Sequence, residues 1–222
     1  VIMGAEAEDL AMQSFNKMLF TFHPNLGNSA MRALAICETL GEILEMDPKD
    51  FRNLCIAAQL HDIGLLANEV SGVRRWMRDP EKCSEEELEE INKHPVVAEE
   101  MLDFYPGFEG AKEAVRHHHE NWDGTGYPNN LKGTEIPLAG RIVALADVFD
   151  ALTSPRAYKD AWSVQDAVSH VRKRSGSHFD PRVVGAFEQG IDELLAARER
   201  YGSNGEHNAE TPPANVDAER LA

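Results

Sequence analysis

The stretch HHENWDGTGYP, from His118 to Pro128, joins two adjacent histidines and an acid to a glycine-rich loop that ends in Tyr-Pro. Apolar residues at helical spacing between Ala111 and Glu120 predict a helix that ends at these histidines. Three glycines and two prolines in residues 121–137 predict a loop after that helix. Imidazoles are common ligands of iron, manganese and zinc, so the stretch indicates a metal site. The alternative is an exposed polar helix end.

A second cluster, His61-Asp62, lies upstream in the last turn of a predicted helix. Asp47 is suited to cap that helix and Pro48 to occupy its first turn, and the helix is expected to end near Gly64. Adjacent helical residues project about 100° apart, so the pair cannot bind one ion from the same face. At a helix end the two can serve neighbouring ions, with Asp62 as a bridge. The alternative is a histidine that interacts with the helix dipole.

A third cluster lies downstream in RIVALADVFDAL, within a helix expected from Leu138 to Leu152. This helix is apolar on most faces, so the carboxylate of Asp147 is costly there unless it is paired or bound to a metal. Asp150 lies about one turn further on. Pairing with an arginine such as Arg141 is an adequate alternative for one of the two acids.

Apolar residues recur at helical spacing along almost the whole chain, and no segment alternates convincingly with the period of a β-strand. We therefore expect an all-α fold. His94, which precedes Pro95, lies at a junction between helices, although a lone histidine there is more typical of a cap or a surface position. Further helices are expected at about residues 8–22, 30–44, 85–94, 163–174 and 181–200.

The chain is expected to have three parts. Residues 1–22 form an N-terminal helix that links to a further domain, packs on the main domain or forms a homodimer. Residues 23–200 form the main domain. Residues 201–222, which include TPPAN and few apolar side chains, are expected to be a disordered acidic tail.

The formal net charge of −16 over 222 residues argues against a partner that is polymeric nucleic acid, which requires a basic surface. No apolar run approaches the roughly 20 residues that cross a bilayer, so no membrane segment is expected. The three cysteines, Cys37, Cys55 and Cys83, lack paired spacing. They indicate reduced thiols and a cytoplasmic location.

Five motifs occur in an order that resembles HD-GYP domains, a bacterial branch of the HD metal-dependent phosphohydrolases. They are HDIG (61–64), HP (94–95), HHENWDGTGYP (118–128), IPLAGRIVALADVFDALTSPRAYK (136–159) and SGSHFDPRVV (175–184). The resemblance covers about residues 10–200. It implies an HD-domain-like helical bundle with a GYP signature loop, and hydrolysis of cyclic di-GMP to pGpG or GMP in bacterial signalling.

The resemblance also implies a set of site residues and two or three divalent metal ions, often iron or manganese. The implied metal ligands are His61, Asp62, His94, His118, His119 and Asp147, among which Asp62 is the bridge and His61, Asp62 and Asp147 are catalytic. The implied substrate contacts are Arg156 and Lys159 for phosphate, and Gly126, Tyr127 and Pro128 in the loop beside the substrate. Without that resemblance, Arg156 and Lys159 fit a solvated basic turn equally well.

Two departures from the family pattern affect the site. Leu65 stands where many members have a lysine near the substrate. Asn25 and Ser29 stand where members with three metals have a Glu and a His, and neither is a good ligand for a transition metal. We therefore predict a site for two ions.

Two functions remain open. The first is a cyclic di-GMP phosphodiesterase with a two-metal core, slow or altered in substrate. The second is a weakly active or inactive module that binds cyclic di-GMP or a partner such as a diguanylate cyclase domain. A nucleotidase or other HD hydrolase is a third and weaker alternative, because the GYP motif is not general to HD proteins.

Overall fold

The computed structural model describes residues 4–68, 70–155 and 160–200. Within these ranges every regular secondary-structure element is a helix, which confirms the predicted all-α fold. The β pairing there is a single isolated bridge between Ser175 and Phe179. The helices are α1 (Gly4–Phe22), α2 (Pro24–Ile43), α3 (Pro48–Leu60), α4 (Val70–Arg78), α5 (Glu85–Ile91), α6 (His94–Leu102), α7 (Glu109–Arg116), α8 (Leu138–Thr153), α9 (Val164–Lys173), α10 (Pro181–Gln189) and α11 (Ile191–Glu199). The short 3-10 helices are η1 (Ile63–Ala67), η2 (Pro80–Lys82) and η3 (Gly133–Glu135).

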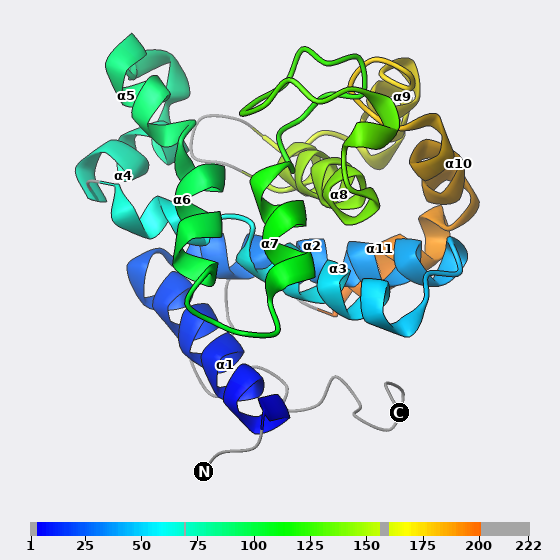
Figure 1. Cartoon of the computed structure of the whole chain (residues 1–222). Coiled ribbons are helices and arrows are strands. Elements are labelled where there is room, and N and C mark those ends of the chain that lie inside the picture. Colours follow the sequence, from blue (N-terminus) through cyan, green and yellow to red (C-terminus); the bar gives the residue numbers. More distant parts are fainter. Residues whose placement is uncertain (1–3, 69, 156–159, 201–222) are drawn as a thin grey trace.

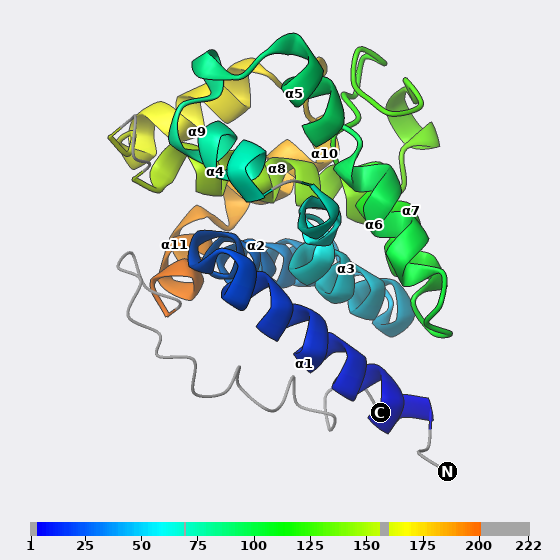
Figure 2. The ribbon, with the colours of Figure 1, turned by 90° about the vertical axis from the view of Figure 1, so that its left-hand side faces the viewer.

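Helix α2 is the centre of the bundle. It packs against α1, α3, α8 and α11, while α3 also contacts α7 and α8 (Figures 1 and 2). Fully buried side chains from several helices fill the space between them, among them Ile36, Leu54, Leu145, Phe149 and Phe187. Burial of these apolar side chains is the main stabilising term of such a bundle.

The predicted starts of four helices are confirmed. Asp47 accepts backbone hydrogen bonds from the first turn of α3, and Ser84 forms a capping box with Glu87 at α5. Ser163 and Asp180 cap α9 and α10 in the same way. These caps involve residues within three positions of one another, so they can be predicted from the sequence.

Several predicted helix ends are wrong. Helix α3 ends at Leu60 and the chain continues into η1, where Gly64 packs directly against the backbone of α6. The segment expected at 181–200 is two helices, divided at Gly190, where an added Cβ would lie 2.2 Å from Ile43 Cδ1. In both places a glycine packs against a residue that is distant in sequence.

Helix α1 packs along α2 and α3, and it buries Phe15 and Leu19 (Figure 2). Packing on the main domain was one of the three expectations for this segment. Leu10 and Met18 on its other side are about half exposed. In the ranges that the structure describes, no helix has the length and apolar character needed to cross a membrane.

Candidate metal centre

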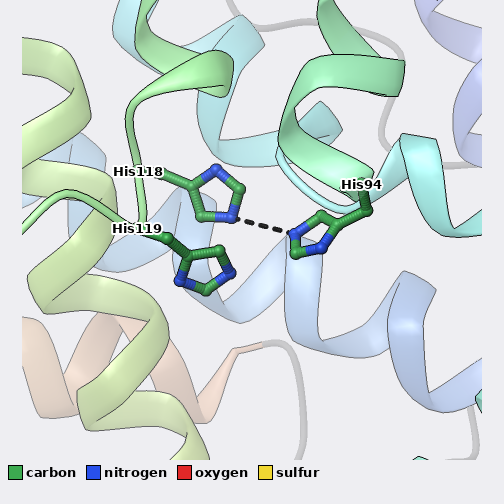
Figure 3. A group of neighbouring side chains, drawn as sticks. All are labelled: His94, His118 and His119. Atoms are coloured by element: carbon green, nitrogen blue, oxygen red, sulfur yellow. Dashed lines mark hydrogen bonds between the residues drawn. The ribbon is translucent and has the colours of Figure 1, made fainter. Parts of the chain in front are cut away.

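The three predicted His/Asp clusters meet at one place in the bundle. His61 and Asp62 lie in the turn between α3 and η1, and His94 is the first residue of α6. His118 and His119 follow the end of α7, while Asp147 lies within α8. Figure 3 shows the ring of His94, at the start of α6, grouped with the rings of His118 and His119, which follow α7.

A short separation between two imidazoles defines the core of this group. The Nε2 atoms of His94 and His118 lie 3.3 Å apart, a contact that the dashed line in Figure 3 marks. One possible ligand atom from each of His94, His118 and His119 lies within 4.8 Å of the other two. Two ligand atoms that each bond an ion at about 2.1 Å are about 3–3.5 Å apart, so the spacing fits a bound cation.

The orientation of the rings strengthens this argument. Three of them use Nδ1 to donate to the backbone carbonyl three residues earlier: His61 to Ala58, His94 to Ile91, and His118 to Val115. In a neutral imidazole with Nδ1 protonated, Nε2 has a lone pair and no hydrogen. The two facing Nε2 atoms therefore cannot bond to each other directly, and a cation between them would resolve the contact. Among the residues that the structure describes, the buried Nε2 of His61 likewise finds no hydrogen-bond partner.

Two carboxylates complete the group. Asp62 Oδ1 lies 3.4 Å from His94 Nε2, and Asp62 Oδ2 lies 3.6 Å from His61 Nε2, so each oxygen faces a different imidazole. Asp147 Oδ1 lies 3.9 Å from His61 Nε2. Carboxylate oxygens and imidazole nitrogens gathered in this way are donors that suit divalent metal ions.

Burial controls the protonation of the histidines. It lowers the pKa of His94, and burial together with neighbouring imidazoles holds the pKa values of His118 and His119 well below the usual range. Burial also lowers the pKa of His61, but the carboxylates of Asp62 and Asp147 outweigh it and the net shift is upward. The three histidines with lowered pKa values are therefore neutral near pH 7, as metal ligands must be.

A glycine brings two of the clusters together. A Cβ added at Gly64 would lie 2.0 Å from the backbone oxygen of His94 and 2.8 Å from the backbone nitrogen of Ala98. Only glycine allows this approach, because real Cβ atoms do not come so close to backbone atoms. The HDIG turn can therefore lie against the first turn of α6, which places Asp62 beside His94.

The GYP loop folds back over the centre. The Tyr127 ring stacks on the His119 ring with centroids 4.9 Å apart, and Tyr127 N donates to His119 O at 3.1 Å. Gly126 is buried against the backbone of residues 119–121, and the peptide bond between Tyr127 and Pro128 is cis. Burial, together with the charges of Asp62 and Asp147, raises the pKa of Tyr127, so its phenol stays protonated.

Sequence reasoning assigned no role to Glu120, the acid that follows the histidine pair. Its buried carboxylate accepts hydrogen bonds from the backbone nitrogens of Asn129, at 2.6 Å, and Leu131, at 3.1 Å. Glu120 therefore ties the far end of the loop to its beginning. The sequence signal was the acid directly before a glycine-rich segment, since loop backbone nitrogens need acceptors.

Asp150 is paired with arginines. Arg32 donates to both of its oxygens, at 2.7 and 2.9 Å, and Arg198 donates at 3.1 Å. Arginine pairing was the alternative considered for one of the two acids of α8, but the suggested partner was wrong. Arg141 instead pairs with Asp180 at the start of α10.

The residues at the two departures from the family pattern have ordinary structural positions. Leu65 is fully buried in the core, Ser29 donates to Asp150 at 2.9 Å, and Asn25 is exposed. His117, the first of the histidine triplet, bonds to the backbone oxygen of Glu113. The predicted phosphate contacts Arg156 and Lys159 lie outside the described ranges.

Comparisons with known proteins agree with this arrangement. The family model described as "HD domain" matches residues 13–183. A 3'3'-cGAMP-specific phosphodiesterase 2 from Vibrio cholerae is 35% identical over 174 residues, which is 78% of this chain and 33% of that protein. The cyclic di-GMP phosphodiesterase response regulator RpfG from Xanthomonas campestris is 39% identical over 176 residues, 76% of this chain and 44% of RpfG. The chain thus spans less than half the length of these relatives.

Solved structures share the fold. A cyclic GMP-AMP specific phosphodiesterase from V. cholerae, V-cGAP3, has a TM-score of 0.64 at 21% identity, over 86% of this chain and 51% of that one. Bd1817, an HDG"Y"P protein from Bdellovibrio bacteriovorus, has a TM-score of 0.58 at 19% identity, over 75% and 52% of the two chains. The family match, the relatives and the helical architecture confirm the resemblance stated from the sequence: the chain belongs to the HD domain family.

Proposed function

We propose that this chain is a metal-dependent phosphodiesterase that hydrolyses the 3'-5' phosphodiester of cyclic di-GMP to pGpG or GMP in bacterial signalling. The observation that carries the proposal is the pair of Nε2 lone pairs of His94 and His118, which face each other at 3.3 Å and need a cation. The names of the relatives, which are cyclic di-GMP and cGAMP phosphodiesterases, support the substrate class.

The proposed centre holds two divalent ions, iron or manganese. Its ligands would be the set named from the sequence: His61, Asp62, His94, His118, His119 and Asp147. Asp62 would be the bridge, because its two oxygens face different imidazoles. When bound, two neighbouring ions lower the pKa of water and offset negative charge on a phosphoryl group that undergoes in-line displacement.

The chain's own residues have distinct parts in this proposal. Asp62 and Asp147 supply negative charge that balances the ions, and the neutral histidines supply lone pairs without adding charge. Tyr127 stacks on His119, and Gly126, Tyr127 and Pro128 are proposed to lie beside the substrate. Arg156 and Lys159 are proposed to hold substrate phosphate, which would also explain how a chain of net charge −16 accepts a dianion.

A second candidate is a module with little turnover that binds cyclic di-GMP or a partner such as a diguanylate cyclase domain. The observation that favours it is Leu65, whose buried apolar side chain stands where many family members have a lysine near the substrate. We also propose the division into residues 1–22, 23–200 and 201–222, the last of which lie outside the described residues, and homodimer formation through residues 1–22. A cytoplasmic location is proposed from the free thiols of Cys37, Cys55 and Cys83.

The test is chromatographic detection of pGpG and GMP after incubation with cyclic di-GMP. It is run anaerobically with ferrous iron and separately with manganese, and cyclic GMP-AMP serves as a competing substrate. Asp62→Ala is the control that should lose turnover. Product that depends on metal and vanishes in this variant is the expected result. No product from folded, metal-loaded protein would contradict the enzyme, and retained nucleotide binding would then favour the module.

A further inference from the structure

Three of the four histidines in the centre are oriented by the same device, and the fourth is not. His61, His94 and His118 each use Nδ1 to bond to a backbone carbonyl, which fixes the ring and directs Nε2 to the centre. Within residues 4–68, 70–155 and 160–200, no hydrogen bond reaches a ring nitrogen of His119. A metal ligand without such a partner needs another contact to hold its ring, because a ring that rotates freely loses entropy when the metal binds and fixes it.

The Tyr127 ring supplies that contact. Its plane lies 27° from the plane of the His119 ring, with centroids 4.9 Å apart, which is a stacked geometry. Two other rings contact His119. The centroid of the His118 ring lies 4.0 Å from that of His119 with the planes tilted by 42°, and the centroid of the His94 ring lies 5.0 Å away with the planes nearly perpendicular. Tyr127 is therefore the stacking partner from outside the histidine group (Figure 3 shows the three histidines).

The chain holds Tyr127 in this position through the residues around His119. Tyr127 N donates to His119 O, and a Cβ at Gly126 would lie 2.3 Å from Asn121 N, so the loop backbone packs directly on the turn. Glu120 accepts from the backbone of the residues that follow the GYP motif. The turn that carries the histidine and the loop that carries the tyrosine are thus one unit.

We propose that Tyr127 is a positioning residue that orients His119 for metal binding by ring stacking. The inference rests on the proposed role of His119 as a ligand, and it assigns the aromatic ring, not the hydroxyl, to this task. This role of Tyr127 is additional to the expected position of the loop beside the substrate. The consequence is that the loop controls the affinity of the centre for its ion before any nucleotide binds.

The experiment measures the affinity of metal-free protein for Co(II) and Mn(II) by calorimetric titration, and the absorption spectrum of the Co(II) form. Tyr127→Phe keeps the ring and is expected to bind within about two-fold of the wild type. Tyr127→Ala removes the ring, and Tyr127→Leu keeps apolar bulk without a stacking plane. Both are expected to lose about 10- to 100-fold in affinity, the usual effect of removing a contact that orients a ligand.

A double-mutant cycle separates this role from general damage to the fold. If Tyr127 acts through His119, Tyr127→Ala should add little to the loss already caused by His119→Ala. Phe104→Ala is the matched control, because Phe104 is an aromatic side chain that is 84% exposed, and its loss should leave metal affinity unchanged. Thermal unfolding of each metal-free variant shows that the protein is folded.

Three results would overturn the proposal: wild-type affinity in Tyr127→Ala and Tyr127→Leu, a loss in Tyr127→Phe equal to that in Tyr127→Ala, or fully additive losses in the cycle. The readout uses no nucleotide. Wild-type protein that binds metal without hydrolysing cyclic dinucleotides would therefore contradict the proposed enzyme and leave this role of Tyr127 standing. Wild-type protein that binds no metal would contradict both.

Discussion

Replacing Asp150 with alanine should lower the free energy of unfolding by about 3–5 kcal/mol, the usual cost of removing one partner from a buried ion pair. The Asp150 side chain is 1% exposed, and those of Arg32 and Arg198 are each 13% exposed. The substitution leaves two guanidinium groups without a counter-charge in a place that water hardly reaches. It also removes the ion pairs that join α8 to α2 and α11, which supply the two arginines.

The magnitude follows from the contacts. Three hydrogen bonds join charged groups, and Ser29 and Ser154 donate two more to the same carboxylate. A hydrogen bond to a charged group contributes about 1.5–3 kcal/mol, so the gross loss exceeds the net figure. The desolvation of the three charged side chains opposes the favourable hydrogen bonds, so the net loss of stability on removing Asp150 falls in the range of about 3–5 kcal/mol.

The assay is urea unfolding of the metal-free protein, followed by circular dichroism. Arg198→Met leaves the two-point contact between Arg32 and Asp150, so its loss should be smaller than that of Asp150→Ala. Glu90→Ala is the control, because its ion pair with Lys93 is exposed and should contribute nothing measurable. The reasoning would be refuted by a loss under about 1 kcal/mol for Asp150→Ala, or by an equal loss for Glu90→Ala.

Four further predictions concern Leu65, the ionisation of Asp150, Gly64 and the metal. Leu65→Lys should lower the free energy of unfolding by about 3 kcal/mol or more, because it buries an ammonium group in the core, and it should not raise turnover. A stable variant with higher turnover would contradict the core position of Leu65. Burial opposes ionisation of Asp150, but Arg32 and Arg198 outweigh it and hold its pKa below the ordinary value. Its contribution to stability should therefore be complete above about pH 4 and be lost as the pH falls through the lowered pKa, and unfolding measured from pH 5 to 2 should show a shallower decline in Asp150→Asn. Gly64→Ala should displace the first turn of α6 and lower metal affinity, which titration can measure; unchanged affinity would show that His94 does not depend on this approach. Removal of metal with a chelator should lower the melting temperature, and free metal at 100 times its Kd should raise the free energy of unfolding by about 2.7 kcal/mol. A melting temperature that does not change with metal would count against the centre.

The residues of the candidate site are easier to recognise in the sequence than the contacts that bring them together. The adjacent histidines, the HD pair and the acid inside an apolar helix are unusual enough to be noticed one by one, and the order of the motifs joined them. The approach of Gly64 to His94 and the part played by Glu120 were not predictable in this way. Each depends on two segments that meet only in the folded chain.

By itself the sequence determined the all-α class and the starts of α3, α5, α9 and α10, because apolar spacing and capping act within one or two turns. Only the tertiary structure decided where α3 and α10 end and which arginines pair with Asp150. It also decided that the ring of Tyr127 lies on His119. The ends of α3 and α10 and the ion pairs of Asp150 involve packing between residues far apart in the chain, and the Tyr127 ring reaches His119 only when the loop between them has folded. Such contacts leave no periodic pattern in the sequence.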